Sequence, residues 1–552
     1  MKHKLKLLSC LMAALLGCST LAACGGSVVD SGAESINKDK TQLYVFCANW
    51  GYGTDWFFNS VKEYETLNAE REFEPGKKGI QIVPYTPMDN LSVSQIKGDL
   101  TNEVYFLEAV PYHSYLSENL FADITDCVVK PNPYDNNVTI ESKMSEQMKD
   151  GLKVDGKYYA IPNYTGNYGL IYNADLFDKY NWYFNTDGEI IGMSEGDNTT
   201  KSAGPNNIPG DYDDGLPQTY AQFFKLCDAI VEHEITPVCW TGTYYEQHLE
   251  GLLNTLVADY EGVENISKRI TFKDTEKLAS LDANGKLTID ADGKVVVDND
   301  ATEITNDTGY EVFRQSGIYY GLQFIEKLIK TADYHNDKAF STYSQRDAQD
   351  DFIYAGKDGK TGEIAMLVDG DWWQSEARDT FEAAKQYGTK YERNFKYMPL
   401  PKATAEKVGE RACNIDFDFA YAFVSKSTKA EKVPIATDFI QFVYSNDQMV
   451  KFTKTTNTIK ALNYTMTEAD MNELTPYGRS LFNYKKSGKS DTVVLTGSNE
   501  KFIKYFARIK EPYIAEYNDL QYGPAQAFKD VSSATAKTYF ENMYKYWKEN
   551  WN

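Results

Sequence analysis

Cysteine and histidine are scarce in this chain, which has eight cysteines and five histidines among 552 residues. Five cysteines lie beyond the N-terminal segment. They are odd in number, scattered and without a CxxC pair, so we expect no disulfide framework. Most of them sit in apolar runs, where a thiol is typically buried as a small hydrophobic group. The histidines lack the spacing of metal ligands, and neither a metal site nor a cofactor is predicted.

Basic residues are also few, because 57 Lys and Arg oppose 80 Asp and Glu, giving a net charge of −23. No basic stripe interrupts this acidity, which argues against a nucleic-acid partner. The sequence contains no Cys/His nucleophile signature and no phosphate-binding GxxxxGK[ST] motif. We therefore expect a protein that is not an enzyme.

No apolar run is long enough for a lasting transmembrane helix, which needs ~20 residues. The N-terminus has Lys2, Lys4 and Lys6, then apolar residues 7–16 and the quartet Leu-Ala-Ala-Cys that ends at Cys24. Residues 1–23 are predicted to be a secretory signal, and the quartet resembles a bacterial lipobox. That resemblance implies lipidation of Cys24, with residues 24–40 as a flexible tether.

Two alternatives to this lipobox remain open. A second quartet ends at Cys18, but its apolar run is shorter and its second residue is bulkier. The leader also fits an ordinary cleaved signal in which Cys24 is incidental. Acyl chains on Cys24 would hold the protein at the membrane, because two or more buried chains anchor where one does not.

Aromatic residues are abundant, with 41 Tyr, 28 Phe and 8 Trp making 14 % of the chain. Many must fill a core. Tyrosine exceeds what a core needs, because a buried hydroxyl requires a partner. The surplus favours a surface that grips an amphipathic ligand.

Strand patterns and helix patterns alternate along the chain, which is typical of an α/β fold with a mostly parallel sheet. A helix is expected from the cap at Thr54, with apolar residues recurring on one face. Strands are expected at 42–47, 80–84, 103–107, 158–161, 169–172 and 365–368. Further helices are expected at 220–232, 311–331, 435–444 and 534–551.

Two stretches are predicted to be insertions, near 185–217 and 281–300. The first is rich in Gly, Asn and Asp. The second reads as a β-hairpin with strands at 286–289 and 294–297 around an Asp-Gly turn. Its aspartates do not match EF-hand spacing, but a calcium site stays open as the alternative.

Several sequence blocks, taken together in order, resemble the carbohydrate-type extracellular solute-binding proteins of ABC importers, the maltose-binding-like family. The most specific is VDGKYYAIP at 154–162, followed by GLIYNADLF at 169–177. Glu108, the two insertions and Lys460, where a proline is usual, depart from the pattern. The other matching blocks are 99–107 with 120–126, 216–220, 362–366 with 369–372, 398–401 and 439–461.

The resemblance implies a type II periplasmic-binding-protein-like α/β fold, with two lobes joined by hinge crossovers and a ligand cleft between them. Lobe 1 would hold 41–157 and 402–460, and lobe 2 would hold 158–401 and 461–552. It also implies a monomer anchored at the extracellular face of the bacterial cell membrane. There it would bind a sugar, which we expect to be an oligosaccharide, and deliver it to ABC permease subunits.

A sugar presents hydroxyls at its rim and C–H groups on its faces, so its site needs flat rings beside acids and amides. Loops after predicted strands supply such sets. The family's stacking aromatics correspond to Trp372 and to the segment around Trp240. The full set of predicted ligand-binding residues is Asn49, Trp50, Tyr52, Glu108, Tyr112, His113, Tyr164, Asn167, Trp240, Tyr244, Tyr245, Asp369, Trp372, Trp373, Asn414 and Asp416.

Three other functions remain open from the sequence. A secreted glycoside hydrolase needs two carboxylates ~5–9.5 Å apart, and 80 acidic residues supply such pairs by chance. A binder of a non-sugar solute such as a peptide or polyol is the second. A structural surface lipoprotein with no small ligand is the third. The order of the blocks favours the sugar binder.

Overall fold

The computed structural model describes residues 35–88, 90–357, 362–388, 392–416, 419–486, 488, 490–506 and 513–551. The predicted signal 1–23, the predicted lipidation residue Cys24 and most of the tether 24–40 lie outside the described residues. Within the described part of the chain, no helix is both long enough and apolar enough to span a bilayer.

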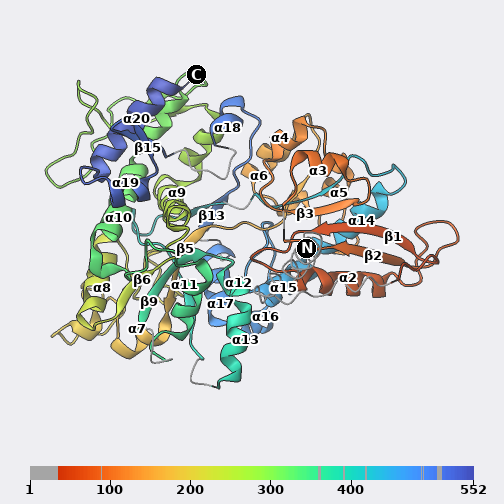
Figure 1. The fold of residues 1–552 in the computed structure, drawn as a ribbon, viewed down its shortest axis with the longest axis horizontal. Helices are drawn as coiled ribbons and strands as arrows, with labels where there is room; N and C mark the ends of the chain where they lie inside the picture. The colour runs from red at the N-terminus through yellow and green to blue at the C-terminus, as the bar shows by residue number, and fades with distance from the viewer. Residues whose placement is uncertain are drawn as a thin grey trace, which may run out of the picture.

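Two separate β-sheets organise the chain (Figure 1). The first sheet has the strand order β2-β1-β3-β12-β4. β1 pairs in parallel with β2 and β3, while β12 runs antiparallel to both of its neighbours. Its strands are β1 (Thr41–Cys47), β2 (Ile80–Tyr85), β3 (Val104–Leu107), β12 (Tyr421–Val424) and β4 (Ile161–Pro162).

Helices α2 (Asp55–Leu67), α14 (Val433–Val443) and α15 (Asn446–Thr456) pack together beside the first sheet. α2 buries an apolar face that includes Phe57, Val61 and Tyr64, as its sequence period predicts. The Tyr64 hydroxyl donates to Asp438 on α14, so even the polar tip of this core ring is satisfied.

The second sheet has the strand order β10-β5-β9-β6. Here β5 runs antiparallel to β9 and β10, and β6 runs parallel to β9, so the expectation of a mostly parallel sheet is wrong for this half. Helices on both faces leave β5 and β9 buried along their whole length. The elements are β5 (Tyr168–Asn173), β6 (Thr236–Cys239), β9 (Ile364–Gly370), β10 (Phe395–Met398), α8 (Tyr220–Glu232), α9 (Tyr245–Thr271), α11 (Gln345–Tyr354) and α17 (Pro476–Lys486).

A helical layer covers the outer side of α9 (Figure 1). It consists of α10 (Ser316–Lys330), α19 (Pro524–Asp530) and α20 (Ala536–Asn550), with the hairpin β14 (Ala515–Tyr517) and β15 (Leu520–Tyr522) beside it. α9 bends at Gly262, where φ is 72° and ψ is 175°. A residue with a Cβ is strained at that φ, so the bend depends on glycine.

The remaining elements are short. β11 (Ala412–Ile415) pairs in parallel with β13 (Ser490–Val493), and β7 (Thr275–Glu276) pairs with β8 (Thr302–Glu303). The other α-helices are α3 (Val93–Gly98), α4 (Tyr112–Ser117), α5 (Thr125–Val129), α6 (Glu146–Leu152), α7 (Ala174–Tyr180), α12 (Trp373–Glu376), α13 (Arg378–Gln386), α16 (Glu468–Glu473) and α18 (Glu500–Tyr505). The 3-10 turns include Glu141–Lys143, Ile191–Met193, Gly309–Arg314, Ala332–Tyr334 and Ala405–Lys407.

Each sheet has its own large hydrophobic core. One core is formed by residues within 43–164 and 419–494, and the other by residues within 170–415 and 493–551. A smaller cluster packs on the second sheet between α11, α12 and α17. The chain passes between the two packed halves between β4 and β5, between β11 and β12, and after α15.

Three sequence expectations fail locally. The helix expected at 311–331 is interrupted at Gln315, whose ψ of 130° is not helical and whose side chain accepts from Arg269 Nε at 2.6 Å. The strand expected at 158–161 is observed only at Ile161–Pro162, which pairs with Tyr421 and Ala422 of β12. The hairpin expected within 281–300 forms isolated bridges such as Ile289–Val295 instead of continuous strands.

The aspartates of that segment serve its turns. Asp282 accepts from the backbone amides of Asn284 and Lys286, and Asp290 accepts from those of its own turn in the same way. In the second of these turns Gly293 follows Asp292 and adopts a positive φ of 81°, as an Asp-Gly turn requires. The described residues contain no group of three or more metal-ligating side chains.

Candidate functional site

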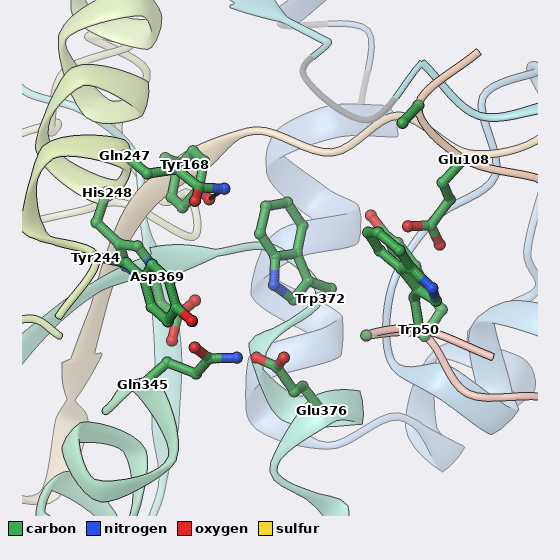
Figure 2. A pocket seen from close by; sticks show the side chains of 13 residues that line it. Trp50, Glu108, Tyr168, Tyr244, Gln247, His248, Gln345, Asp369, Trp372 and Glu376 are labelled. Atoms are coloured by element: carbon green, nitrogen blue, oxygen red, sulfur yellow. Dashed lines mark hydrogen bonds between the residues drawn. The ribbon is translucent and has the colours of Figure 1, made fainter. Parts of the chain in front are cut away.

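A cavity of about 270 Å³ lies between the two sheets. Its walls come from loops after β1 and β3 on one side and from β5, β9, α9, α11 and α12 on the other. Figure 2 shows these two sets of side chains facing each other with Trp372 between them. The lining residues are Trp50, Gly51, Tyr52, Glu108, Ala109, Tyr168, Tyr244, Gln247, His248, Gln345, Asp369, Trp372 and Glu376.

Trp372 is wedged by glycines from both sides of the cavity. A Cβ on Gly51 would lie 2.9 Å from Trp372 Cδ1, and one on Gly370 would lie 2.2 Å from Trp372 Cζ2. Tyr168 meets the indole edge-on, with 5.1 Å between ring centroids. The absence of side chains at the two glycines lets the indole fit closely, so it stands as a fixed ring in the cavity.

Other rings form the walls around it. Trp50 and Tyr244 are 41 % and 49 % exposed, which leaves their faces available to a ligand. Tyr52 is buried, and its ring centroid lies 3.9 Å from that of Tyr164. Exposed large rings beside a cavity are a typical binding feature, because they offer contact area at little cost in entropy.

A short seam joins the two sides next to the cavity. The Tyr52 backbone carbonyl accepts from the Ser375 hydroxyl at 2.9 Å, and its own hydroxyl lies 3.4 Å from Asp371 Oδ1. Gly53 has a φ of +67°, and a Cβ there would collide with the Arg378 guanidinium. The loop 51–53 therefore contacts the segment 371–378 over its whole length.

Three carboxylates line the cavity, from both sides. Burial is the main cause that raises the pKa of Glu108 to about 7 and that of Asp369 to about 7. Burial and the nearby Asp369 charge also raise the pKa of Glu376. The Gln349 amide donates to Asp369 Oδ2 at 3.0 Å and to Glu376 Oε2 at 2.7 Å, so it holds these two carboxylates side by side.

The nitrogen groups in the cavity are neutral. His248 Nδ1 lies 3.2 Å from the Val368 carbonyl, which makes it the donor nitrogen. Burial lowers the pKa of His248 to about 4. Gln247 donates to the Tyr168 hydroxyl at 2.9 Å and so fixes that ring. The cavity thus offers rings, amides and acids, which suits a ligand with many hydroxyls.

Six of the predicted site residues line this cavity: Trp50, Tyr52, Glu108, Tyr244, Asp369 and Trp372. Four others support it from behind or beside it. Tyr164 donates to Glu108, the Asn167 carbonyl accepts from the Asp371 amide, and Asp416 accepts from the Gly166 amide. Asn49 precedes Trp50 in the same loop.

Two predicted tryptophans lie in cores instead. Trp240 has no exposed surface, and its Nε1 donates to the Ala339 carbonyl at 2.9 Å. Trp373 is also fully buried and packs against Phe395 and Tyr477. Both tryptophans follow strands, but their rings pack in the cores around the second sheet and not in the cavity.

The other predicted residues also lie off the cavity lining. Tyr112 packs against Phe121 in the first core, and its hydroxyl donates to the Leu152 carbonyl. His113 contacts the Gly151 carbonyl, which ties it to α6. The remaining two are Tyr245, which packs on Phe340 at the start of α9, and Asn414, whose side chain accepts from Tyr484.

Seven lining residues lie outside the predicted set, and five of them have side chains larger than a methyl group: Tyr168, Gln247, His248, Gln345 and Glu376. Glu376 lies four residues after Trp372, so a helical period from the predicted tryptophan would have found it. Gln345 begins α11, and nothing in its local sequence marks it. A GxSxG pattern at 192–196 carries no nucleophile elbow, because Ser194 lies in the insertion, after a 3-10 turn and not after a strand.

The comparisons with known proteins identify the family. The sequence pattern of the family described as bacterial extracellular solute-binding protein matches residues 72–473. A comparison with curated proteins found no match.

Solved structures share the architecture at low sequence identity. RafE from Streptococcus pneumoniae in its apo form has a TM-score of 0.53 at 11 % identity, covering 93 % of this chain and 99 % of that one. A chitin oligosaccharide binding protein has a TM-score of 0.51 at 15 % identity, covering 93 % and 99 %. A protein from work on xylan utilization by Caldanaerobius polysaccharolyticus has a TM-score of 0.52 at 13 % identity, covering 92 % and 99 %.

These likenesses confirm the predicted two-lobe α/β fold, with the cavity between its lobes. The family match covers well over half of the chain and spans loops from both cavity walls. This chain belongs to the bacterial extracellular solute-binding proteins.

Proposed function

We propose that this protein binds a carbohydrate between its two lobes and delivers it to the permease of an ABC importer. The observation that carries the proposal is the inter-lobe cavity, in which Trp372 stands between acids and amides from both sides. Two structures of the same fold support the ligand class, one a RafE complex with raffinose and the other a chitin oligosaccharide binding protein.

The chemistry of the cavity fits a sugar. A pyranose lays its C–H face on a flat ring, and covering about 100 Å² of that face contributes about 2.5 kcal/mol at ~25 cal/mol/Å². Its hydroxyls need partners, because each one left unpaired costs about 1–3 kcal/mol. Trp372, Trp50 and Tyr244 supply rings, while Glu108 and Asp369 supply acceptors.

The anchor and the lobe limits belong to the same proposal. Acylated Cys24 would hold the protein at the extracellular face of the cell membrane as a monomer, within reach of the permease subunits. Lobe 1 would comprise 41–157 with 402–460, and lobe 2 the remaining folded chain. The two large cores support later limits, near 164–170 in place of 157 and near 415–419 in place of 402, and the first core extends past 460 to Leu474, Phe482 and Val494.

A panel of mono- and oligosaccharides, read by thermal shift and calorimetry, tests the function. A ligand at 100 times its Kd adds ~2.7 kcal/mol to the free energy of unfolding, which is a clear shift. No response to any sugar would overturn the proposal and favour a structural lipoprotein or a binder of another solute. Cleavage products in the same tubes would instead favour the glycoside hydrolase.

A further inference from the structure

The charges that line the inter-lobe cavity all have one sign. Among the residues that the structure describes, its lining includes three carboxylates and no lysine or arginine. Glu108 faces the cavity from the loop after β3, whereas Asp369 and Glu376 come from the opposite side (Figure 2). Glu108 and Asp369 are only 7 % and 2 % exposed.

The partners of these carboxylates are neutral. Glu108 accepts from the Tyr164 hydroxyl, Asp369 accepts from the Gly370 amide, and Gln349 bridges Asp369 to Glu376. Across the described residues, no lysine, arginine or histidine forms an ion pair with any of the three. A buried carboxylate without a cation resists ionisation, and like charges nearby increase that resistance.

The neighbouring cations Lys485 and Arg378 lie outside the cavity lining. Lys485 forms a buried ion pair with Asp371, behind the cavity. The Arg378 guanidinium packs against Gly53 in the seam between the lobes. His248 is kept neutral by burial, which lowers its pKa to about 4. The carboxyls of the cleft therefore have no cation to stabilise their ionised form, and a bound cation would supply one.

Geometry adds a second reason for a cationic ligand group. An ammonium has three donors, and Asp369 and Glu376 lie side by side on one wall to accept from it. Gln349 holds Asp369 and Glu376 within 3.0 Å of one amide nitrogen, so a single ammonium can contact both. The rings of Trp372 and Trp50 attract a cation through their faces.

Resting on the carbohydrate function proposed above, we propose that the cleft prefers sugars that carry a protonated primary amine over neutral sugars and over sugar acids. Glu376 and Asp369 on one side and Glu108 on the other determine this preference. An N-acetylated sugar loses the charge and keeps the ring. A uronate brings a further carboxylate into a cavity that already holds three.

Matched ligand pairs test the preference. Calorimetry at pH 6.5 compares glucosamine with N-acetylglucosamine, galactosamine with N-acetylgalactosamine, and their β-1,4-linked oligomers of equal length, with galacturonate oligomers as the acidic arm. Within each pair that binds, we expect the amino sugar to bind at least tenfold more tightly than its N-acetylated partner. We expect galacturonate oligomers to bind weakest. Binding of the amine should also release protons, because Glu108 and Asp369 have pKa values of about 7 and ionise beside a cation.

Glu376→Gln and Asp369→Asn should each reduce the preference, measured as the ratio of the two Kd values within a pair, to about threefold or less, whatever each variant does to the Kd of the neutral partner. Glu382→Gln, an exposed acid on α13 away from the cavity, is the matched control and should leave the preference unchanged. Equal or tighter binding of the neutral partner, tightest binding of galacturonate, or a preference that survives both cavity variants would overturn the inference but leave the carbohydrate function standing. A complete lack of sugar binding, neutral sugars included, would overturn both.

Discussion

Truncation of Trp372 separates a ligand platform from a structural ring. Trp372→Ala removes an indole that is only partly buried and that contacts Gly51, Gly370 and Tyr168. A sugar stacked on one face covers about 100 Å², worth about 2.5 kcal/mol at ~25 cal/mol/Å². Kd should therefore rise roughly 70-fold.

The neighbouring residue supplies the control. Trp373 is fully buried among Phe395 and Tyr477, so Trp373→Ala should cost about 3–5 kcal/mol of stability through the cavity it leaves. Trp372→Ala should cost much less, because its ring already borders open space. Calorimetry with the best sugar of the panel gives Kd, and urea unfolding gives the free energy of unfolding.

The contrast between adjacent tryptophans makes the result decisive. A Kd for Trp372→Ala within threefold of the wild type would refute the reasoning, because the platform would then contribute no ring contact. A loss of stability equal to that of Trp373→Ala would also refute it, since the ring would be a core residue. Neither outcome depends on which sugar is bound.

Three further perturbations follow from buried or crowded groups. Burial lowers the pKa of Lys460 to about 7 from its ordinary 10.5, so the unfolded chain binds more protons than the folded chain between these pH values, and the free energy of unfolding should rise with pH across them. Lys460→Met should flatten that slope in urea titrations from pH 7 to 10.5. The pKa of Glu108 is raised to about 7 from 4.5, so the stabilising contribution of the protonated carboxyl is lost as pH rises through that window. The free energy of unfolding of Glu108→Gln should exceed that of the wild type by about 1–3 kcal/mol at pH 8 and by little at pH 4, and equal differences at both pH values would contradict this. Gly51→Ala places a Cβ 2.9 Å from Trp372 and should weaken sugar binding by about 1 kcal/mol in calorimetry, with no change if the indole can shift freely.

Local sequence patterns predicted the elements that have clear boundary residues at their ends. The apolar face of α2 and the strands after it were found because period and caps agree with the packing. The split at Gln315 was missed, since it depends on Arg269, which lies far away in the sequence. The shortness of β4 was also missed, since its pairing partner β12 lies far away in the sequence.

The same distinction explains the site. Loops after strands β1, β3 and β9 reach the cavity, as their position at strand ends predicts. Sequence does not reveal which way a side chain points at a strand end. Trp240 therefore looked equivalent to Trp372, although it is buried and its Nε1 donates to the Ala339 carbonyl. The high tyrosine content also reflects the cores more than the site, since buried rings such as Tyr64 and Tyr158 donate their hydroxyls to Asp438 and Glu141.

The seam beside the cavity has a consequence for solute capture. Ser375 binds the Tyr52 carbonyl, and Arg378 abuts Gly53, yet neither side chain lines the cavity. Opening the lobes must break these contacts together. The contacts therefore help to set the ratio of closed to open molecules before any solute binds. Apparent affinity scales with the fraction of competent molecules. Evolution can thus tune uptake at Ser375 while leaving every group that touches the cargo unaltered.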